Sequence, residues 1–261
     1  MDGIDTFVLF LLVGLLAQTV DGALGMAYGV TSSSVLIAFG VPPAAASASV
    51  HVAEVFTTGA SGLSHAAHKN VKWRLFFPLV IGGVLGGVAG AFFLTGIDGD
   101  VIKPFIIAYL GIMGFYILYR GLKGIIPARF ATRWAGPLGL VGGFFDAVGG
   151  GGWGPTVTTT MVGAGLEPRK AIGTVNTAEF FVTTAISATF VWALVSGHWE
   201  EAGDLKEHAV AVAGLVVGGL IAAPFAGLIT KRIPTKVLTL MVGTLIIVLA
   251  GYQLARLLGV I

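Results

Sequence analysis

The amino-acid sequence predicts an all-α polytopic membrane protein made of two inverted-topology repeats, each with about five hydrophobic segments. Three observations predict this fold class. First, 56% of the 261 residues are hydrophobic and only 11% are charged, so the chain has too little polar surface for a soluble globular protein. Second, the apolar residues fall into segments separated by short polar or glycine-rich stretches. Third, these segments occur as two similar sets along the chain.

The two sets are related by a shift of 125 positions. Residues 13–54 align without a gap with residues 138–179, and 12 of these 42 positions are identical. Two acidic pairs are among the identical positions: Asp21 with Asp146, and Glu54 with Glu179. We therefore assign residues 1–125 to a first repeat and residues 126–261 to a second, within one integral membrane domain.

In the first repeat a break or a turn ends each hydrophobic segment. Asp21 and the glycine after it interrupt the first segment, and the prolines at 42 and 43 end the second because proline lacks an amide hydrogen. A basic linker with an interfacial tryptophan, residues 68–74, ends the third, and an acidic turn at 98–100 ends the fourth. The expected segments are Phe7–Val20, Ala23–Phe39, Ala44–Ala67, Leu75–Thr95 and Val101–Leu118.

The second repeat follows the most basic linker of the chain and shows the same pattern. Its expected segments are Trp134–Phe145, Trp153–Ala164, Ala171–Val195, His208–Thr230 and Lys236–Leu258. The opening segments are short, since the 14 residues of Phe7–Val20 would form about 21 Å of helix unless Gly3–Thr6 extend them, whereas the hydrocarbon core is about 30 Å thick. We therefore expect the first two segments of each repeat to be short, broken or re-entrant.

The charged loops predict the topology. With the N-terminus outside and five segments in each repeat, Lys69 and Arg129 lie in inside loops, whereas Asp98 and Glu201 lie in outside loops. Because five is an odd number, the second repeat enters the membrane from the opposite face. The first six residues carry two acids and no base, unlike a secretory signal peptide. We expect a multi-pass protein of the bacterial inner, or plasma, membrane.

The glycine-rich stretches around Gly25 and Gly150 interrupt the apolar segments at corresponding places in the two repeats, and we call them the glycine breaks. Such breaks point to the central binding site of a transporter. Helix N-termini beside such breaks expose backbone amides that attract an anion, and glycine lets a ligand approach the backbone. We expect Asp21 and Asp146 to cap these half-helices, whereas Trp153 either lines the site or packs there. The residues of the breaks that we expect to bind substrate are Gly25, Tyr28, Gly29, Ser33, Gly150, Gly151, Trp153 and Thr158.

A polar stripe on the third segment of each repeat completes the expected site. It carries His51 and Glu54 at helical spacing in the first repeat, and Asn176 and Glu179 at the equivalent positions of the second. A charge at the membrane centre costs about 2.5–3.5 kcal/mol or more, so we assign both glutamates to the transport pathway. Burial favours the neutral carboxyl, which can donate a hydrogen bond to an anion, so this arrangement would couple transport to protons.

Two stretches of the second repeat are distinctive: Gly149–Gly152 with the following Trp153-Gly154-Pro155, and Ala171-Ile172-Gly173-Thr174. Together with the duplicated organisation of the whole chain, they resemble the TauE/SafE family of membrane permeases. The glycine run of the first repeat is more dilute and resembles the family less closely. The resemblance implies transport of a small sulfur-containing anion such as sulfite, thiosulfate or a sulfonate.

Other functions stay open at this point, namely a permease or channel for a carboxylate, a metal cation or a neutral solute, and a membrane enzyme. Two residue pairs have the spacing of metal ligands, His51 with Glu54 and His65 with His68. The second repeat has Asn176 and Phe190 in place of His51 and His65, so we expect no metal site and no cofactor. The chain has no G-x-S-x-G motif, so we expect no enzyme.

The expected partners follow from the same composition. They are a small anion, protons and the lipid bilayer, because the net charge of +2 and the scattered basic residues offer no nucleic-acid surface. The oligomeric state is not indicated by the sequence.

Overall fold

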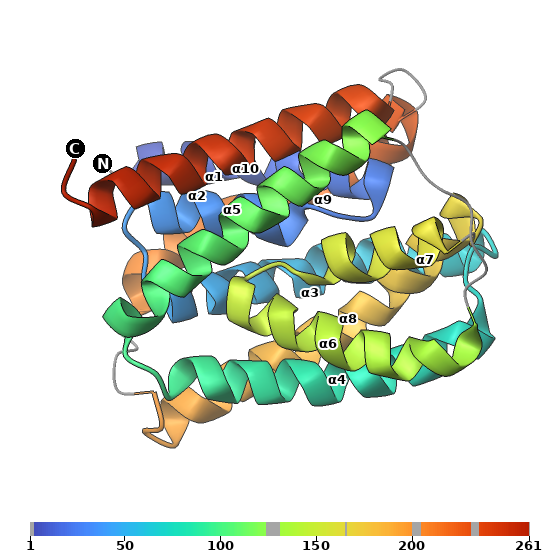
Figure 1. The fold of residues 1–261 in the computed structure, drawn as a ribbon, viewed down its shortest axis with the longest axis horizontal. Helices are drawn as coiled ribbons and strands as arrows, with labels where there is room; N and C mark the ends of the chain where they lie inside the picture. Colours follow the sequence, from blue (N-terminus) through green and yellow to red (C-terminus); the bar gives the residue numbers. More distant parts are fainter. Residues whose placement is uncertain (1–2, 124–130, 165, 200–204, 231–234, 261) are drawn as a thin grey trace.

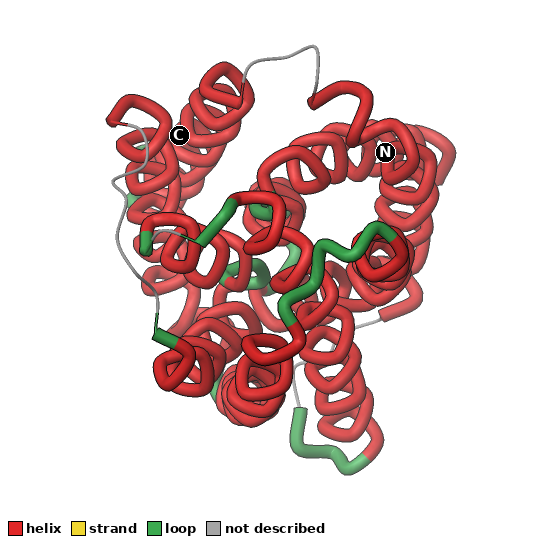
Figure 2. The backbone as a smooth tube through the Cα atoms, turned by 90° about the vertical axis from the view of Figure 1, so that its right-hand side faces the viewer, coloured by secondary structure: helices red, strands yellow, loops and turns green. Residues whose placement is uncertain are grey.

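The computed structural model describes residues 3–123, 131–164, 166–199, 205–230 and 235–260. These residues are helical apart from short connections, and no strand occurs among them (Figures 1 and 2). The elements of the first half are α1 (Gly3–Leu24), α2 (Tyr28–Ala38), α3 (Pro43–Ala67), α4 (Trp73–Thr95) and α5 (Gly99–Lys123). Those of the second half are η1 (Thr132–Trp134), α6 (Ala135–Gly149), η2 (Gly154–Thr158), α7 (Thr159–Gly163), α8 (Pro168–Val195), α9 (Leu205–Thr230) and α10 (Thr235–Leu257).

Each of the ten predicted segments corresponds to a helix, or in one case to the short turn η2 continued by α7. The all-α polytopic class is therefore confirmed. Four stretches of the described chain are long and apolar enough to cross a membrane: Gly3–Gly22, Trp73–Thr95, Gly99–Lys123 and Arg169–Val195.

The first segment is longer than predicted. Helix α1 continues through Asp21, and its 22 residues form about 33 Å of helix, enough to cross a bilayer. The prediction that the segment ends before Asp21 is therefore wrong, whereas the extension by residues 3–6, which the sequence left open, is present. The helix ends only near Gly25, where the backbone turns into the left-handed region. The equivalent α6 has 15 residues and α2 has 11, so these segments are short as expected.

The helices pack in pairs that are equivalent under the 125-residue shift. Helix α1 packs most extensively against α9, and its counterpart α6 packs to the same extent against α4, the counterpart of α9. Helices α5 and α10 pair with each other, as do α3 and α8 (Figure 1). Each repeat therefore packs its first helix against the fourth helix of the other.

Glycines allow these exchanged pairs to pack backbone against backbone. A Cβ atom on Gly86 of α4 would lie 2.0 Å from the carbonyl oxygen of Leu140 of α6. A Cβ atom on Gly218 of α9 would lie equally close, at 2.0 Å, to the carbonyl oxygen of Leu11 of α1. Small residues at such contacts are typical of membrane helices, where close packing replaces the hydrophobic drive for association.

The topology stays a prediction. Lys69 and Asp98 lie at opposite ends of α4, as predicted for an inside loop and an outside loop. Arg129 and Glu201 lie outside the described residues.

Candidate functional site

The two glycine breaks have the same backbone conformation. Gly25 follows α1 with φ +62°, and Gly150 follows α6 with φ +65°, so both lie in the left-handed region that glycine adopts without steric cost. These two glycines occupy equivalent positions in the two repeats. The predicted pair of matched breaks is therefore present in the backbone.

The breaks also pack directly on each other. A Cβ atom on Gly29 would lie 2.5 Å from the Cα atom of Gly151, and a Cβ atom on Gly154 would lie 2.5 Å from the Cα atom of Met26. The shift of 125 positions converts the first contact into the second. The first turn of α2 and the first turn of η2 thus each pack against the break of the other repeat. The backbones lie so close that there is no room for a side chain at Gly29 or Gly154.

Hydroxyl groups bond the two breaks together. The Oγ1 atom of Thr158 donates to the carbonyl oxygen of Gly25 at 2.7 Å, and the Oγ atom of Ser33 lies 3.4 Å from the carbonyl oxygen of Gly149. The hydroxyl of Ser33 also lies 3.3 Å from the carbonyl oxygen of Val30 in its own helix, so only Thr158 is clearly engaged with the opposite break. The expected binding of substrate by these two hydroxyls stays a prediction. Other buried hydroxyls of α2 have no hydrogen-bond partner among the described residues: Thr31, Ser32 and Ser34.

Asp146 caps the second half-helix, as predicted. Its Oδ1 atom accepts hydrogen bonds from the backbone amides of Gly152 at 2.8 Å and Trp153 at 2.9 Å. In the first repeat, the equivalent Asp21 faces the backbone amide of Tyr28, which is the counterpart of Trp153. We expected backbone amides at the second break to be free to bind a substrate anion. The amides of Gly152 and Trp153 instead donate to Asp146, so this expectation is wrong at the second break.

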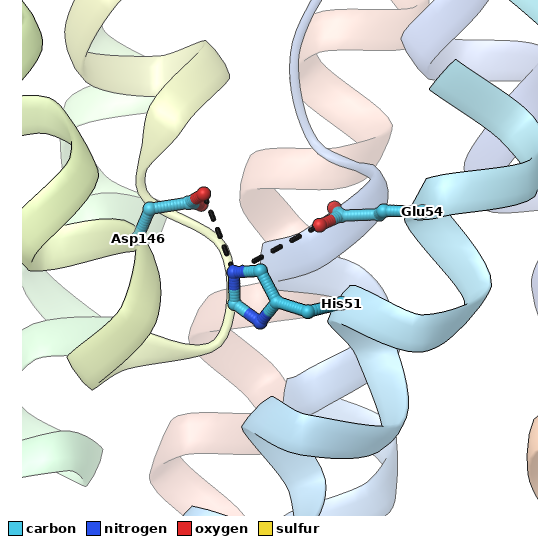
Figure 3. Close-up of side chains that lie close together, drawn as sticks. All are labelled: His51, Glu54 and Asp146. Atoms are coloured by element: carbon cyan, nitrogen blue, oxygen red, sulfur yellow. Dashed lines mark hydrogen bonds and ion pairs between the residues drawn. The ribbon is translucent and has the colours of Figure 1, made fainter. Parts of the chain in front are cut away.

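The second oxygen of Asp146 faces His51. The Nε2 atom of His51 lies 3.3 Å from Oδ2 of Asp146 and 4.0 Å from Oε2 of Glu54, and all three side chains are buried (Figure 3). Figure 3 shows the two carboxyl groups approaching the same edge of the imidazole from opposite sides. Helix α3 of the first repeat and the break of the second therefore build one cluster.

The imidazole is held in a defined orientation. Its Nδ1 atom lies 2.7 Å from the backbone carbonyl oxygen of Ser47, and because a carbonyl only accepts, Nδ1 carries the hydrogen. In the neutral ring the Nε2 atom then carries a lone pair and no hydrogen, and it faces two carboxyl groups. Lone pairs that face each other repel, so a proton or another cation must occupy the space between them.

The buried core contains more acidic than basic groups. Four carboxyls are buried, those of Asp21, Glu54, Asp146 and Glu179, whereas the described chain buries no lysine or arginine. Four carboxylates cannot all be ionised in a low-dielectric interior without compensating positive charge. Protonated carboxyls or a bound cation would supply this compensation.

The remaining predicted residues divide between packing and the site. The hydroxyl of Tyr28 donates to the carbonyl oxygen of Leu215 at 3.1 Å, and the indole nitrogen of Trp153 donates to that of Val175 at 3.2 Å. Both aromatic side chains are buried, and these contacts favour a packing role. Asn176 differs, because its amide nitrogen faces Ser61 while its oxygen has no partner within the described residues.

The chain is similar to known membrane transport proteins. A family model described as sulfite exporter TauE/SafE matches residues 10–253. A protein of Bacillus subtilis (strain 168), described as probable membrane transporter protein YtnM, is 44% identical over 247 residues, which is 92% of this chain and 80% of that protein. No solved structure matches the chain.

Proposed function

Because this chain belongs to the TauE/SafE family and is a multi-pass membrane transporter, we propose that its cargo is a small sulfur-containing anion that moves together with protons. Sulfite, thiosulfate and a sulfonate are the candidate substrates. The family description supports the sulfur chemistry, and the geometry of the core supports the coupling.

One observation carries the proposal: the two glycine breaks cross in the core directly beside the cluster of His51, Glu54 and Asp146. Broken helices at corresponding places in two repeats form the central site of many transporters. A break provides backbone groups that a small ligand can approach, and the cluster provides groups that take up positive charge.

Charge balance links the anion to the protons. An anion that enters beside four buried carboxylates would meet strong repulsion, because like charges interact strongly in a medium of low dielectric constant. Protons that neutralise the carboxyls remove this repulsion and turn acceptors into hydrogen-bond donors. The anion and the protons would therefore enter and leave together.

Helix α2 is the better candidate for the anion itself. Asp21 faces the amide of Tyr28, but the next amides, of Gly29 and Val30, have no acceptor within the helix, and the hydroxyls of Ser32 and Ser34 are buried without a partner among the described residues. The second break has fewer free donors because Asp146 already accepts from two of its amides. Hydroxyl and amide donors suit an oxyanion.

Flux measurements in proteoliposomes test the proposal. Radiolabelled sulfite, thiosulfate and taurine are offered under an imposed pH gradient and without one. We expect saturable flux of at least one of them, accelerated by the gradient. Glu179→Gln should weaken the acceleration, whereas Glu167→Gln, the same change at an exposed position, should leave it unchanged. Flux of a carboxylate alone would refute the sulfur cargo, and flux that is indifferent to the gradient would refute the coupling.

A further inference from the structure

We propose that His51, Glu54 and Asp146 form a binding site for a divalent transition-metal ion of the zinc class. One donor atom from each residue, the Nε2 atom and one oxygen of each carboxyl, lies within 4.8 Å of the others. An imidazole nitrogen with two carboxylate oxygens is a ligand set that suits zinc and its neighbours, and it leaves a fourth coordination position open. The sequence analysis expected no metal site, because it could not place Asp146 beside His51.

The distances are close to those of a formed site. Donor atoms around one tetrahedral zinc ion lie about 3.3–3.6 Å apart, given bond lengths of about 2.0–2.2 Å. The Nε2 atom of His51 lies 3.3 Å from Oδ2 of Asp146, so this pair already has the required spacing. The 4.0 Å separation from Oε2 of Glu54 would have to shorten by less than 1 Å, which a rotation of the glutamate side chain can provide.

The groups behind the ligands are also in place. A metal-bound histidine usually donates its other ring hydrogen to a carbonyl or carboxylate, and Nδ1 of His51 does so to Ser47. A ligating carboxylate is usually held through its second oxygen, and Oδ1 of Asp146 is held by two backbone amides. These contacts leave Nε2 and Oδ2 directed at the same space.

Glu54 gives an independent indication of a ligand. Its Oε2 atom is buried and has no hydrogen-bond partner among the described residues, and it points toward the imidazole (Figure 3). A buried carboxylate oxygen without a hydrogen bond is costly, and the imidazole lies 4.0 Å away, so an ion between them would supply a closer interaction.

The effect of this metal ion on transport rests on the proposed function. A bound metal ion would occupy the space that we assign to the coupling proton and would link α3 to the break of the other repeat. Metal and proton would therefore compete. Binding itself is measured in detergent without any anion, so its failure is separate from a failure of anion transport.

Titration calorimetry with zinc chloride, on tag-free protein in detergent, tests the binding. We expect one ion per chain, and we expect His51→Asn to lower the affinity by at least about 100-fold because it removes a ligand. Asparagine is the natural residue at the equivalent position 176 of the second repeat. The matched control is His198→Asn, since a ring nitrogen of His198 also lies near a backbone carbonyl oxygen, that of Phe92 at 3.4 Å, but the residue is outside the cluster. Equal affinity of the two variants would overturn the proposal.

Cobalt(II) provides a readout that needs no variant. Bound at this site in the unaltered protein, it should give the intense visible absorption of a four-coordinate ion, and X-ray absorption should show one imidazole among oxygen ligands. The weak spectrum of a six-coordinate ion, or the absence of imidazole, would refute the site.

Glu54→Gln, which removes one charged ligand but keeps the shape of the side chain, should also weaken zinc binding, and unchanged binding would contradict the assignment.

Discussion

Replacing Gly29 by alanine tests whether the contact between the two breaks is essential. Gly29 is a helical residue of α2 with an ordinary backbone conformation, so the substitution introduces no backbone strain. Its new Cβ atom would lie 2.5 Å from Cα of Gly151 and 2.8 Å from Oε1 of Glu54. Real Cβ contacts are not this short, so the two repeats must move apart.

The magnitude follows from two opposing effects. An added methyl group in a packed core costs about 1–3 kcal/mol, whereas alanine in place of a helical glycine contributes about 0.5–1 kcal/mol of stability. We expect a net loss of about 1–2 kcal/mol, which lowers the unfolding temperature by roughly 2–8 °C in a protein of this size. Transport should fall much further, because the displaced contact lies in the site itself.

Thermal unfolding in detergent and flux in proteoliposomes provide the two readouts. The matched control is Gly251→Ala in α10, where a Cβ atom would meet no other atom within 4 Å. This variant should keep full transport and an equal or slightly higher unfolding temperature. If Gly29→Ala matches the control in both measurements, the breaks do not need close contact and our account of the site is wrong.

Three further predictions concern the buried carboxyls, the topology and the stability of the protein. Glu54→Gln and Glu179→Gln should each preserve anion binding but weaken the dependence of flux on a pH gradient; unchanged dependence would give these carboxyls a purely structural role. Because the chain has no cysteine, single cysteines at Lys69 and Asp98 can be labelled selectively, the first from the cytoplasm and the second from outside; labelling of both from one side would refute the topology. Asp146→Ala should lower the free energy of unfolding by about 1–2 kcal/mol because the cap is lost, whereas Asp146→Asn keeps an oxygen that can accept and should cost less; equal unfolding temperatures would contradict this role.

The elements of the fold were predictable because membrane helices are governed by local composition. Apolar runs, prolines and charged loops located all ten segments, and the 125-residue shift located both breaks. The end of α1 was not predictable from hydropathy. Asp21 looked like an interruption, but its side chain is buried within the protein, so the helix can continue to the left-handed Gly25.

The site was predictable only in part, because its central contact joins the two repeats. His51 and Glu54 share one helix, and their spacing was visible in the sequence. Asp146 lies 95 positions from His51, and it reaches the imidazole only because each repeat packs into the other. The recurrence of an aspartate before each glycine break was the available signal. The sequence analysis assigned these aspartates to helix caps. A cap accounts for Oδ1 of Asp146, which accepts from a backbone amide, but not for Oδ2, which faces His51.

The differences between the repeats matter as much as their likeness. In a transporter with inverted repeats, the inward-open and outward-open states exchange the conformations of the two halves, so identical halves would give two states of equal free energy. The backbones of the breaks match closely, with φ +62° at Gly25 and φ +65° at Gly150. The side chains do not match, since His51 contacts Asp146 while the equivalent Asn176 faces Ser61 and leaves its oxygen without a partner in the described chain. In such a transporter, a contact that only one half can make would stabilise one state over the other.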